Sequence, residues 1–313
     1  METSGGKDGT IRRSSESLGS IAAVGTYVMW GLFPLYWKRL SGVEAWQVLS
    51  HRIVWASLFA ILILVATRRF GSLASLFREP KRIGAAAAAG VLISINWGTY
   101  IWAVNNGHVT ESALGYYINP LFSIALGALF LRERLDRFTI AAVAIALSGV
   151  VAASLMLGSP PWIALVLATT FGTYGLVKKK AGLDPVTGLA AETLILAPFA
   201  LGFLALRHLS GRGDFGGPDL VADFMLLLSG VVTAIPLLTF AFATNRISLQ
   251  RLGFFQYISP SGQLLLGLFL FREELTPALM VAFATVIIAV VLYAATRRRV
   301  GPHRSLSDLS TRK

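Results

Sequence analysis

The chain has 313 residues, is 55% hydrophobic and 14% charged, and carries a formal net charge of +12. Soluble proteins carry roughly a quarter charged residues, whereas this sequence repeats apolar runs of about 20 residues, the length that crosses a bilayer core. The composition therefore predicts an all-α polytopic membrane protein. The absence of cysteine excludes disulfides, thiolate metal sites and cysteine catalysis.

The apolar runs predict ten transmembrane helices. In chain order they lie near residues 20–37, 43–66, 84–104, 112–131, 138–157, 161–177, 185–206, 221–243, 252–271 and 277–296. The first run has no signal-peptide cleavage site, so we expect it to be retained as a helix. The polar residues 1–18 predict a disordered tail, and residues 298–313 a basic tail.

The basic residues predict the orientation in the membrane. With both termini in the cytoplasm, 22 Lys and Arg residues fall on the cytoplasmic side, five fall on the other side, and Arg52 lies within a span. Lys178, just after the sixth span, is counted among the 22. An excess of Lys and Arg in short cytoplasmic loops is typical of membrane proteins. The positive charge therefore indicates topology rather than nucleic-acid binding.

Residues 100–135 and 240–275 match each other without a gap at an offset of 140, with ten of 36 positions identical. The match includes Tyr117-Ile118 with Tyr257-Ile258, and Arg132-Glu133 with Arg272-Glu273. It divides the chain into two repeats, 19–157 and 158–297, of five helices each. Because five is odd, the second repeat enters the membrane from the opposite side. Inverted repeats of this kind are typical of secondary transporters with a binding site near the midplane.

Each repeat has one polar helical face. Tyr116, Asn119 and Ser123 are spaced i, i+3 and i+7, which places them on one side of the fourth predicted helix. The offset of 140 relates them to Gln256, Ser259 and Gln263. Inside a bilayer such faces either hydrogen-bond to neighbouring helices or line a water-filled cavity. Their equivalence in the two repeats favours a cavity.

Pro120 and Pro260 lie within the same two helices and each removes a helical hydrogen bond. In transporters, carbonyl groups freed in this way can face a binding site. The alternative is a static kink that lets neighbouring helices pack.

Three ionisable residues lie within predicted spans, namely His51 and Arg52 in the second and Glu192 in the seventh. An offset of 141 makes His51 and Glu192 equivalent. In the functional interpretation, Arg52 meets an anionic group, Glu192 meets a cationic group or a proton, and His51 titrates near neutrality. In the structural alternative, an Arg52–Glu192 or His51–Glu192 ion pair only fixes the packing of the two helices.

Further candidates are Trp55, on the same helical face as His51, and Asn96 and Tyr100, on one face of the third predicted helix. Tyr27, Trp30 and Tyr174 are expected near the same cavity. There is no P-loop and no zinc-binding HExxH motif, so we expect no ATP drive, no metal and no cofactor. A receptor or scaffold would need a partner domain, and an intramembrane enzyme would need a nucleophile–base pair. Both are weaker interpretations than transport.

Several motifs resemble the RarD group of the EamA families, in the drug/metabolite transporter superfamily. They are 28–38 (VMWGLFPLYWK), 51–55 (HRIVW), 96–105 (NWGTYIWAVN), 111–121 (ESALGYYINPL) and 171–176 (FGTYGL). The resemblance covers residues 19–297 and leaves out both tails.

The resemblance implies ten helices in two inverted EamA units, residence in a bacterial inner membrane, and export or exchange of a small metabolite or drug. Members of the group are labelled chloramphenicol-sensitive or chloramphenicol-resistance permeases. It also implies a central cavity between helices 1–4 and 6–9, with helices 5 and 10 behind. The expected partners are a small-molecule substrate, the lipid bilayer and coupling protons, with homo-oligomerisation left open and no nucleic acid.

Overall fold

A computed structural model describes residues 5–131, 135–182, 184–244, 246–247, 252 and 255–299. Within these ranges the regular secondary structure is helical. The elements are α1 (Gly5–Arg39), α2 (Ala45–Ala66), α3 (Phe70–Leu76), α4 (Pro80–Asn105), α5 (Val109–Leu131), α6 (Arg137–Leu157), α7 (Trp162–Ala181), α8 (Pro185–Leu209), α9 (Leu220–Thr244), α11 (Ile258–Leu265), the π-helix η1 (Leu266–Leu270) and α12 (Pro277–Arg299).

Eight of the described helices are long and apolar enough to cross a membrane. They are α1, α2, α4, α5, α6, α8, α9 and α12. Shorter apolar helices, Trp162–Lys178 and Ile258–Leu270, lie where the sixth and ninth spans were predicted. The protein is therefore an all-helical multi-pass membrane protein, and the count of ten spans stays a prediction.

Helix α1 begins at Gly5 and is therefore helical where the composition predicted a disordered tail. Its apolar part starts only at Ser15, and its first internal proline is Pro34. Low hydropathy indicates that a segment does not cross lipid, but it does not stop a helix from continuing beyond the bilayer.

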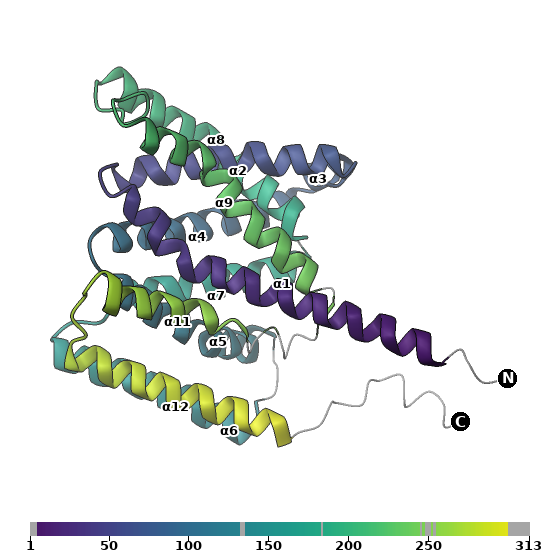
Figure 1. Cartoon of the computed structure of the whole chain (residues 1–313), viewed down its shortest axis with the longest axis vertical. Helices are drawn as coiled ribbons and strands as arrows, with labels where there is room; N and C mark the ends of the chain where they lie inside the picture. Colours follow the sequence, from purple (N-terminus) through teal and green to yellow (C-terminus); the bar gives the residue numbers. More distant parts are fainter. Residues whose placement is uncertain are drawn as a thin grey trace.

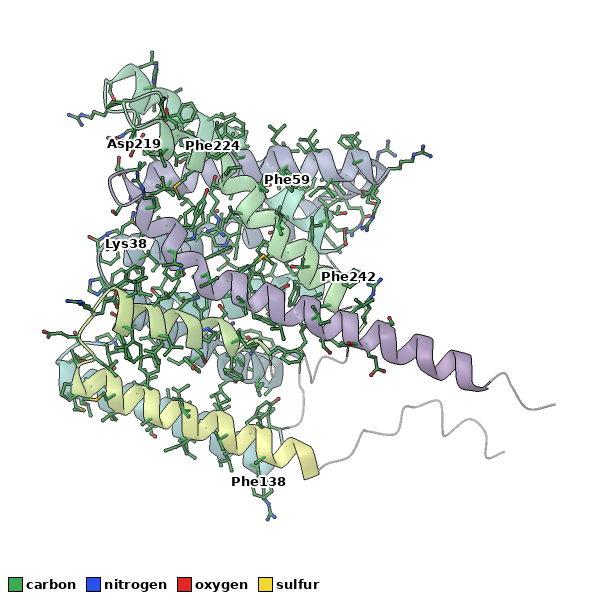
Figure 2. The ribbon with its side chains drawn as sticks, in the orientation of Figure 1. Lys38, Phe59, Phe138, Asp219, Phe224 and Phe242 are labelled. Atoms are coloured by element: carbon green, nitrogen blue, oxygen red, sulfur yellow. The ribbon has the colours of Figure 1, made fainter. Side chains whose placement is uncertain are left out.

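The outer surface of the bundle is covered by large apolar side chains. Leu155, Phe199 and Leu209 expose 79%, 75% and 82% of their surface. Phe138 and Phe224 also point away from the helices (Figure 2). An apolar surface of this extent is unfavourable in water and is suited to contact with lipid chains.

The most extensive helix contacts form a pattern that is preserved when the two halves of the chain are exchanged. Three of these contacts join a helix to its own counterpart: α6 with α12, α2 with α8, and α5 with α11. Six more come in exchanged couples: α5–α7 with α1–α11, α4–α7 with α1–α9, and α2–α9 with α4–α8. Figure 1 shows α6 and α12 along one edge of the bundle, away from α2 and α8. The two halves are thus interleaved, not side by side.

Helices α6 and α12 meet along small residues. Ala142, Ala146 and Ala153 on α6 are buried, as are Ala282 and Ala289 on α12. Small residues let helix backbones approach closely where apolar burial gives no net driving force against lipid. This edge pair is therefore held mainly by close packing.

We predict that Gly149→Leu destabilises the α6–α12 pair. A Cβ atom at Gly149 would lie 1.6 Å from Thr285 Oγ1, so a larger side chain must push the helices apart. Overpacking of this kind costs about 1–3 kcal/mol, which should lower the thermal unfolding midpoint of the purified protein in detergent by several degrees. Gly25→Leu is the matched control, because a Cβ atom there meets nothing within 4 Å. Equal midpoints for the two variants would contradict the prediction.

Candidate functional site

A cavity of about 310 Å³ lies between the two halves of the chain. Its walls come from α1, α2, α4, α5, α7, α8, α9 and residues 256–260, and no described residue of α6 or α12 lines it. The lining residues are Tyr27, Trp30, Phe33, Arg52, Ile93, Trp97, Tyr100, Tyr116, Asn119, Phe171, Tyr174, Lys178, Leu189, Thr233, Leu237, Phe240, Gln256, Ser259 and Pro260. Nine of these nineteen are aromatic, so a ligand would meet mainly ring faces.

Most lining residues occupy equivalent positions in the two sequence repeats. Offsets of 140 or 141 relate seven pairs: Trp30 and Phe171, Phe33 and Tyr174, Ile93 and Thr233, Trp97 and Leu237, Tyr100 and Phe240, Tyr116 and Gln256, and Asn119 and Ser259. The cavity is therefore built twice from the same positions with different side chains. Arg52 and Lys178 depart from this pattern, because their equivalents, Thr193 and Trp37, are not among the described lining residues.

Arg52 lies in the α2 wall with only 3% of its surface exposed. Its Nε donates a hydrogen bond to Thr233 Oγ1 at 3.0 Å. The guanidinium lies 3.9 Å from the ring centre of Trp97, 4.8 Å from that of Trp37 and 6.0 Å from that of Phe33. Among the described residues, its Nη1 has no hydrogen-bond partner and no carboxylate forms an ion pair with it. The rings orient the cation but accept no conventional hydrogen bond from it.

Glu192 of α8 is fully buried and pairs with Lys178 of α7, whose Nζ lies 2.9 Å from Glu192 Oε1. Tyr174 OH donates to the other carboxylate oxygen at 3.1 Å, and Lys178 Nζ donates to Tyr174 OH at 2.9 Å. Tyr174 and Lys178 are one turn apart on the same face of α7. The three side chains form a closed group in which the buried negative charge is compensated.

Asn96 ties three helices together behind the wall. It is 1% exposed, and its Nδ2 donates to the Leu167 carbonyl oxygen and to Thr170 Oγ1, both at 3.0 Å. Its Oδ1 accepts a hydrogen bond from Tyr116 OH at 3.3 Å. The Tyr116 ring in turn meets the Tyr100 ring edge-on, with centroids 5.7 Å apart. Asn96 therefore positions two aromatic rings that line the cavity.

Two polar atoms of the wall, the Tyr100 hydroxyl and Asn119 Oδ1, have no hydrogen-bond partner among the described residues. The equivalent of Asn119, Ser259, accepts a hydrogen bond from Gln263 Nε2 at 3.3 Å, and that amide also donates to the Trp30 carbonyl oxygen at 3.3 Å. Buried polar groups nearly always have partners. The free atoms therefore indicate where a solute or water can bind.

Comparison with known proteins assigns the chain to a family. The EamA-like transporter family matches residues 17–155 and 160–295. The chain is 42% identical to Protein RarD of Streptomyces exfoliatus over 89% of each chain. It is a RarD-type member of the EamA-like transporter family.

Two further comparisons agree with this membership. The transporter is 42% identical to the uncharacterized transporter YojE of Bacillus subtilis, over 90% of this chain and 95% of YojE. A crystal structure of another protein superposes on 90% of this chain and 98% of its own with a TM-score of 0.58. At 19% identity, that similarity shows a shared fold alone.

The structure brings many of the predicted site residues together. Those that line the cavity are Arg52, Tyr100, Tyr116, Asn119, Gln256, Ser259 and Pro260. Asn96, Glu192 and Gln263 lie behind the wall and hydrogen-bond to residues that line it. Ser123, on the same predicted face as Tyr116, is exposed and is not among the described lining residues. The roles of these residues in transport stay predictions.

The structural alternative, an Arg52–Glu192 or His51–Glu192 ion pair, is not present among the described residues, because Glu192 pairs with Lys178. The sequence counts Lys178 among the cytoplasmic basic residues, since it begins the run 178–180 at the end of an apolar segment. Its spacing of four residues from Tyr174 is the signal that could have placed it on the cavity face. Thr233, the partner of Arg52, carried no charge and no motif that would have drawn attention to it.

His51 and Trp55 do not belong to the described cavity lining. The His51 ring lies 5.0 Å from the ring of Phe215, in the segment between α8 and α9, and its Nδ1 accepts a hydrogen bond from Trp55 Nε1 at 3.3 Å. Successive helical residues differ by about 100° in direction, and here Arg52 faces the cavity whereas His51 faces the segment between α8 and α9. The more strongly basic residue is the one that faces the cavity.

The two prolines differ in position and in their effect on the backbone. Pro260 lines the cavity, whereas Pro120 lies within α5 and is not among the described lining residues. Pro120 cannot donate to the carbonyl four residues earlier, that of Tyr116, which lies in the cavity wall. Pro260 lies in the first turn of α11, where backbone N–H groups have no helical acceptor, so the prediction that it removes a helical hydrogen bond is wrong.

We predict that Lys178 and Glu192 stabilise the transporter only as a pair. Lys178→Met leaves a carboxylate with no exposed surface unpaired, and breaking a buried ion pair costs about 3–5 kcal/mol. Lys178→Met should therefore lower the unfolding midpoint in detergent, and adding Glu192→Gln should restore most of the loss. Additive losses in the double variant would contradict the pairing.

Proposed function

We propose that the protein is a secondary transporter that moves a small organic solute across the membrane by alternating access. The observation that carries this proposal is the central cavity, whose walls are supplied in equivalent pairs by the two repeats. A site shared equally by two halves can be exposed to either side when the halves rock against each other. In the proposed topology both termini lie in the cytoplasm of a bacterial cell.

Helix packing supports an inverted arrangement of the two repeats. The most extensive contacts between helices are preserved when the halves are exchanged. Close approaches between crossing helices also occur at equivalent positions of the two repeats. A Cβ at Gly262 would lie 3.3 Å from Gly31 Cα, and one at Gly172, the equivalent of Gly31, would lie 2.7 Å from Phe122, the equivalent of Gly262. Ten spans in two five-helix units account for this pattern.

One end of the bundle is held closed by contacts that join the repeats. The Glu273 carboxylate accepts hydrogen bonds from the backbone N–H groups of Val109 and Thr110, both at 2.8 Å, at the first turn of α5. Glu44 forms an ion pair with Arg207 at the same end. In the proposed topology this end is periplasmic, so these contacts must break when the cavity opens outward. Glu133, the equivalent of Glu273, lies outside the described residues.

Lys38, labelled in Figure 2, closes the same end within the first repeat. Its Nζ donates to the carbonyl oxygens of Val104 and Asn105 at 3.2 and 3.3 Å. These carbonyls belong to the last turn of α4, where a cation is favoured by the helix dipole. The end of α4 is therefore fixed by a side chain of α1, and the start of α5 by Glu273 in the segment between η1 and α12.

We predict that Glu273→Gln shifts the transporter toward the outward-open state. An amide oxygen is a weaker acceptor for the two α5 N–H groups than a carboxylate. Because the chain has no cysteine, single cysteines can be labelled without background. In right-side-out vesicles, Glu273→Gln should increase labelling of Tyr100→Cys from the periplasmic side. It should decrease labelling of Phe240→Cys from the cytoplasmic side of inverted vesicles.

The two positions suit this test because they are repeat equivalents near opposite ends of the cavity. Tyr100 is five residues from the end of α4, and Phe240 is four residues from the end of α9, which runs the other way. Leu155→Cys, on the lipid-facing surface, is the control and should label equally in both backgrounds. Parallel changes at Tyr100 and Phe240 would contradict alternating access.

Glu192 is the proposed site of proton coupling. Its only cation among the described residues is Lys178, whose side chain is 15% exposed and lies at the cytoplasmic part of α7. Movement of α7 against α8 would separate the pair. Burial without a compensating cation favours the protonated form of any carboxyl group, so the carboxylate would take up a proton at that step.

We predict that Glu192→Gln uncouples flux from the proton gradient. Flux of labelled aromatic acids, amino acids and chloramphenicol should be measured in proteoliposomes with and without a pH gradient. The gradient should stimulate wild-type flux but not flux through Glu192→Gln, because an amide cannot take up the proton. Glu79→Gln, at an exposed acid of the α3–α4 turn, is the control. Gradient-stimulated flux through Glu192→Gln would rule out this role.

A further inference from the structure

We propose that the cavity binds a small organic anion, a carboxylate carried on an aromatic ring, with the carboxylate at Arg52. This inference rests on the proposed function for the movement of the solute, but the binding can be tested separately. It starts from the charge that the described residues leave unbalanced.

The charges around the cavity do not cancel. Lys178 and Glu192 compensate each other at 2.9 Å, which leaves Arg52 as a positive charge without a carboxylate among the described residues. Arg52 is 3% exposed and lies seven residues into α2, or about 10 Å along the helix axis. A buried charge at this depth requires a partner. An anionic solute would supply it.

The surroundings of Arg52 leave a specific part of the guanidinium free. Trp97 and Trp37 lie against the guanidinium, and Thr233 accepts the hydrogen bond from Nε. The Nη1 N–H groups remain without an acceptor among the described residues. A guanidinium held by rings and presenting free N–H donors is well suited to the planar, two-oxygen geometry of a carboxylate.

A cationic or zwitterionic solute fits the same cavity poorly. The carboxylate that would receive an ammonium group is Glu192, which is not among the described lining residues, is already paired with Lys178 and accepts a hydrogen bond from Tyr174. The other charged side chains in the wall, Arg52 and Lys178, are both positive. The cavity therefore offers one free cation and no free anion among the described residues.

The remaining walls indicate the rest of the ligand. Nine of the nineteen lining residues are aromatic, which favours a ring that can meet their faces and edges. Asn119 Oδ1 is an acceptor without a described donor, and a ring hydroxyl would supply one. The volume of about 310 Å³ is at the lower end of ligand sites. It suits a single-ring solute better than a peptide or lipid.

Three single-ring compounds of nearly the same size test this inference: 4-hydroxybenzoate, 4-hydroxybenzyl alcohol and 4-hydroxybenzylamine. At pH 7 they are negative, neutral and positive, and they share the ring and its hydroxyl. Binding to the purified full-length transporter in detergent should be measured by isothermal titration. We expect the anion to bind at least about tenfold more tightly than the alcohol, because the alcohol cannot form the charge-assisted hydrogen bond that the carboxylate forms with Arg52. The amine should bind no better than the alcohol.

Variants of Arg52 test whether the carboxylate of the anion binds at this residue. Arg52→Gln should weaken the binding of 4-hydroxybenzoate about 10- to 100-fold and leave the affinity for the alcohol unchanged. Arg52→Lys keeps the charge but loses the planar fork, so it should bind the anion with intermediate affinity. Arg137→Gln, at an exposed arginine that stacks on Phe138 at the start of α6, is the control and should bind all three like the wild type.

The inference is overturned if the wild type binds the alcohol or the amine as tightly as the anion. It is also overturned if Arg52→Gln keeps the preference for the anion. If Arg52→Gln does not fold, the wild-type series and Arg52→Lys still decide. Binding of the anion without flux in proteoliposomes would refute transport and leave this site standing. Flux of other solutes with no preference for anions would refute this site and leave transport standing.

Discussion

Charges and unpaired polar groups are costly inside a bilayer core, and this constraint explains how the polar side chains of the transporter are arranged. Glu192 has a cation from the neighbouring helix, and Asn96 has partners on two other helices. Apolar side chains cover the surface, and the polar ones gather between the two halves. Among the residues that the structure describes, none supplies Arg52 with a counter-ion in this interior. The cost of burying charge therefore favours the binding of an anionic solute at Arg52.

The two repeats use equivalent positions for different chemistry. In one corner of the cavity Arg52 lies against Trp37. In the other corner, Lys178 occupies the position equivalent to Trp37. Thr193 is the equivalent of Arg52, and its neighbour Glu192 pairs with Lys178. One corner thus holds an open cation and the other a compensated pair. In the proposed mechanism, the repeated backbone would let the halves exchange their arrangements, and the differing side chains would determine which solute binds and whether a proton accompanies it.

The sequence predicted the parts of this arrangement that depend on periodicity. The repeat and the helical spacing together placed Tyr116, Asn119, Gln256 and Ser259 in one wall. They could not decide between neighbours such as His51 and Arg52, because a helical wheel shows directions but not which helix lies opposite. The place of Lys178 in the cavity wall was not predicted, for a related reason. Its long side chain returns from near the helix end into the cavity, whereas hydropathy assigns the end of an apolar run to water.

The ends of α5 and α11 link the closed end of the bundle to the cavity. Glu273 holds the first turn of α5, and Gly267 of η1 packs so closely on it that a Cβ atom would lie 2.8 Å from Thr110. Tyr116 lies within two turns of that point on a continuous helix, so movement of the capped end must also move the cavity wall. Beyond Pro120 the missing hydrogen bond allows the rest of α5 to bend separately. Pro120 therefore divides α5 into two parts, and Tyr116 and Asn119 lie in the part that begins at the turn held by Glu273.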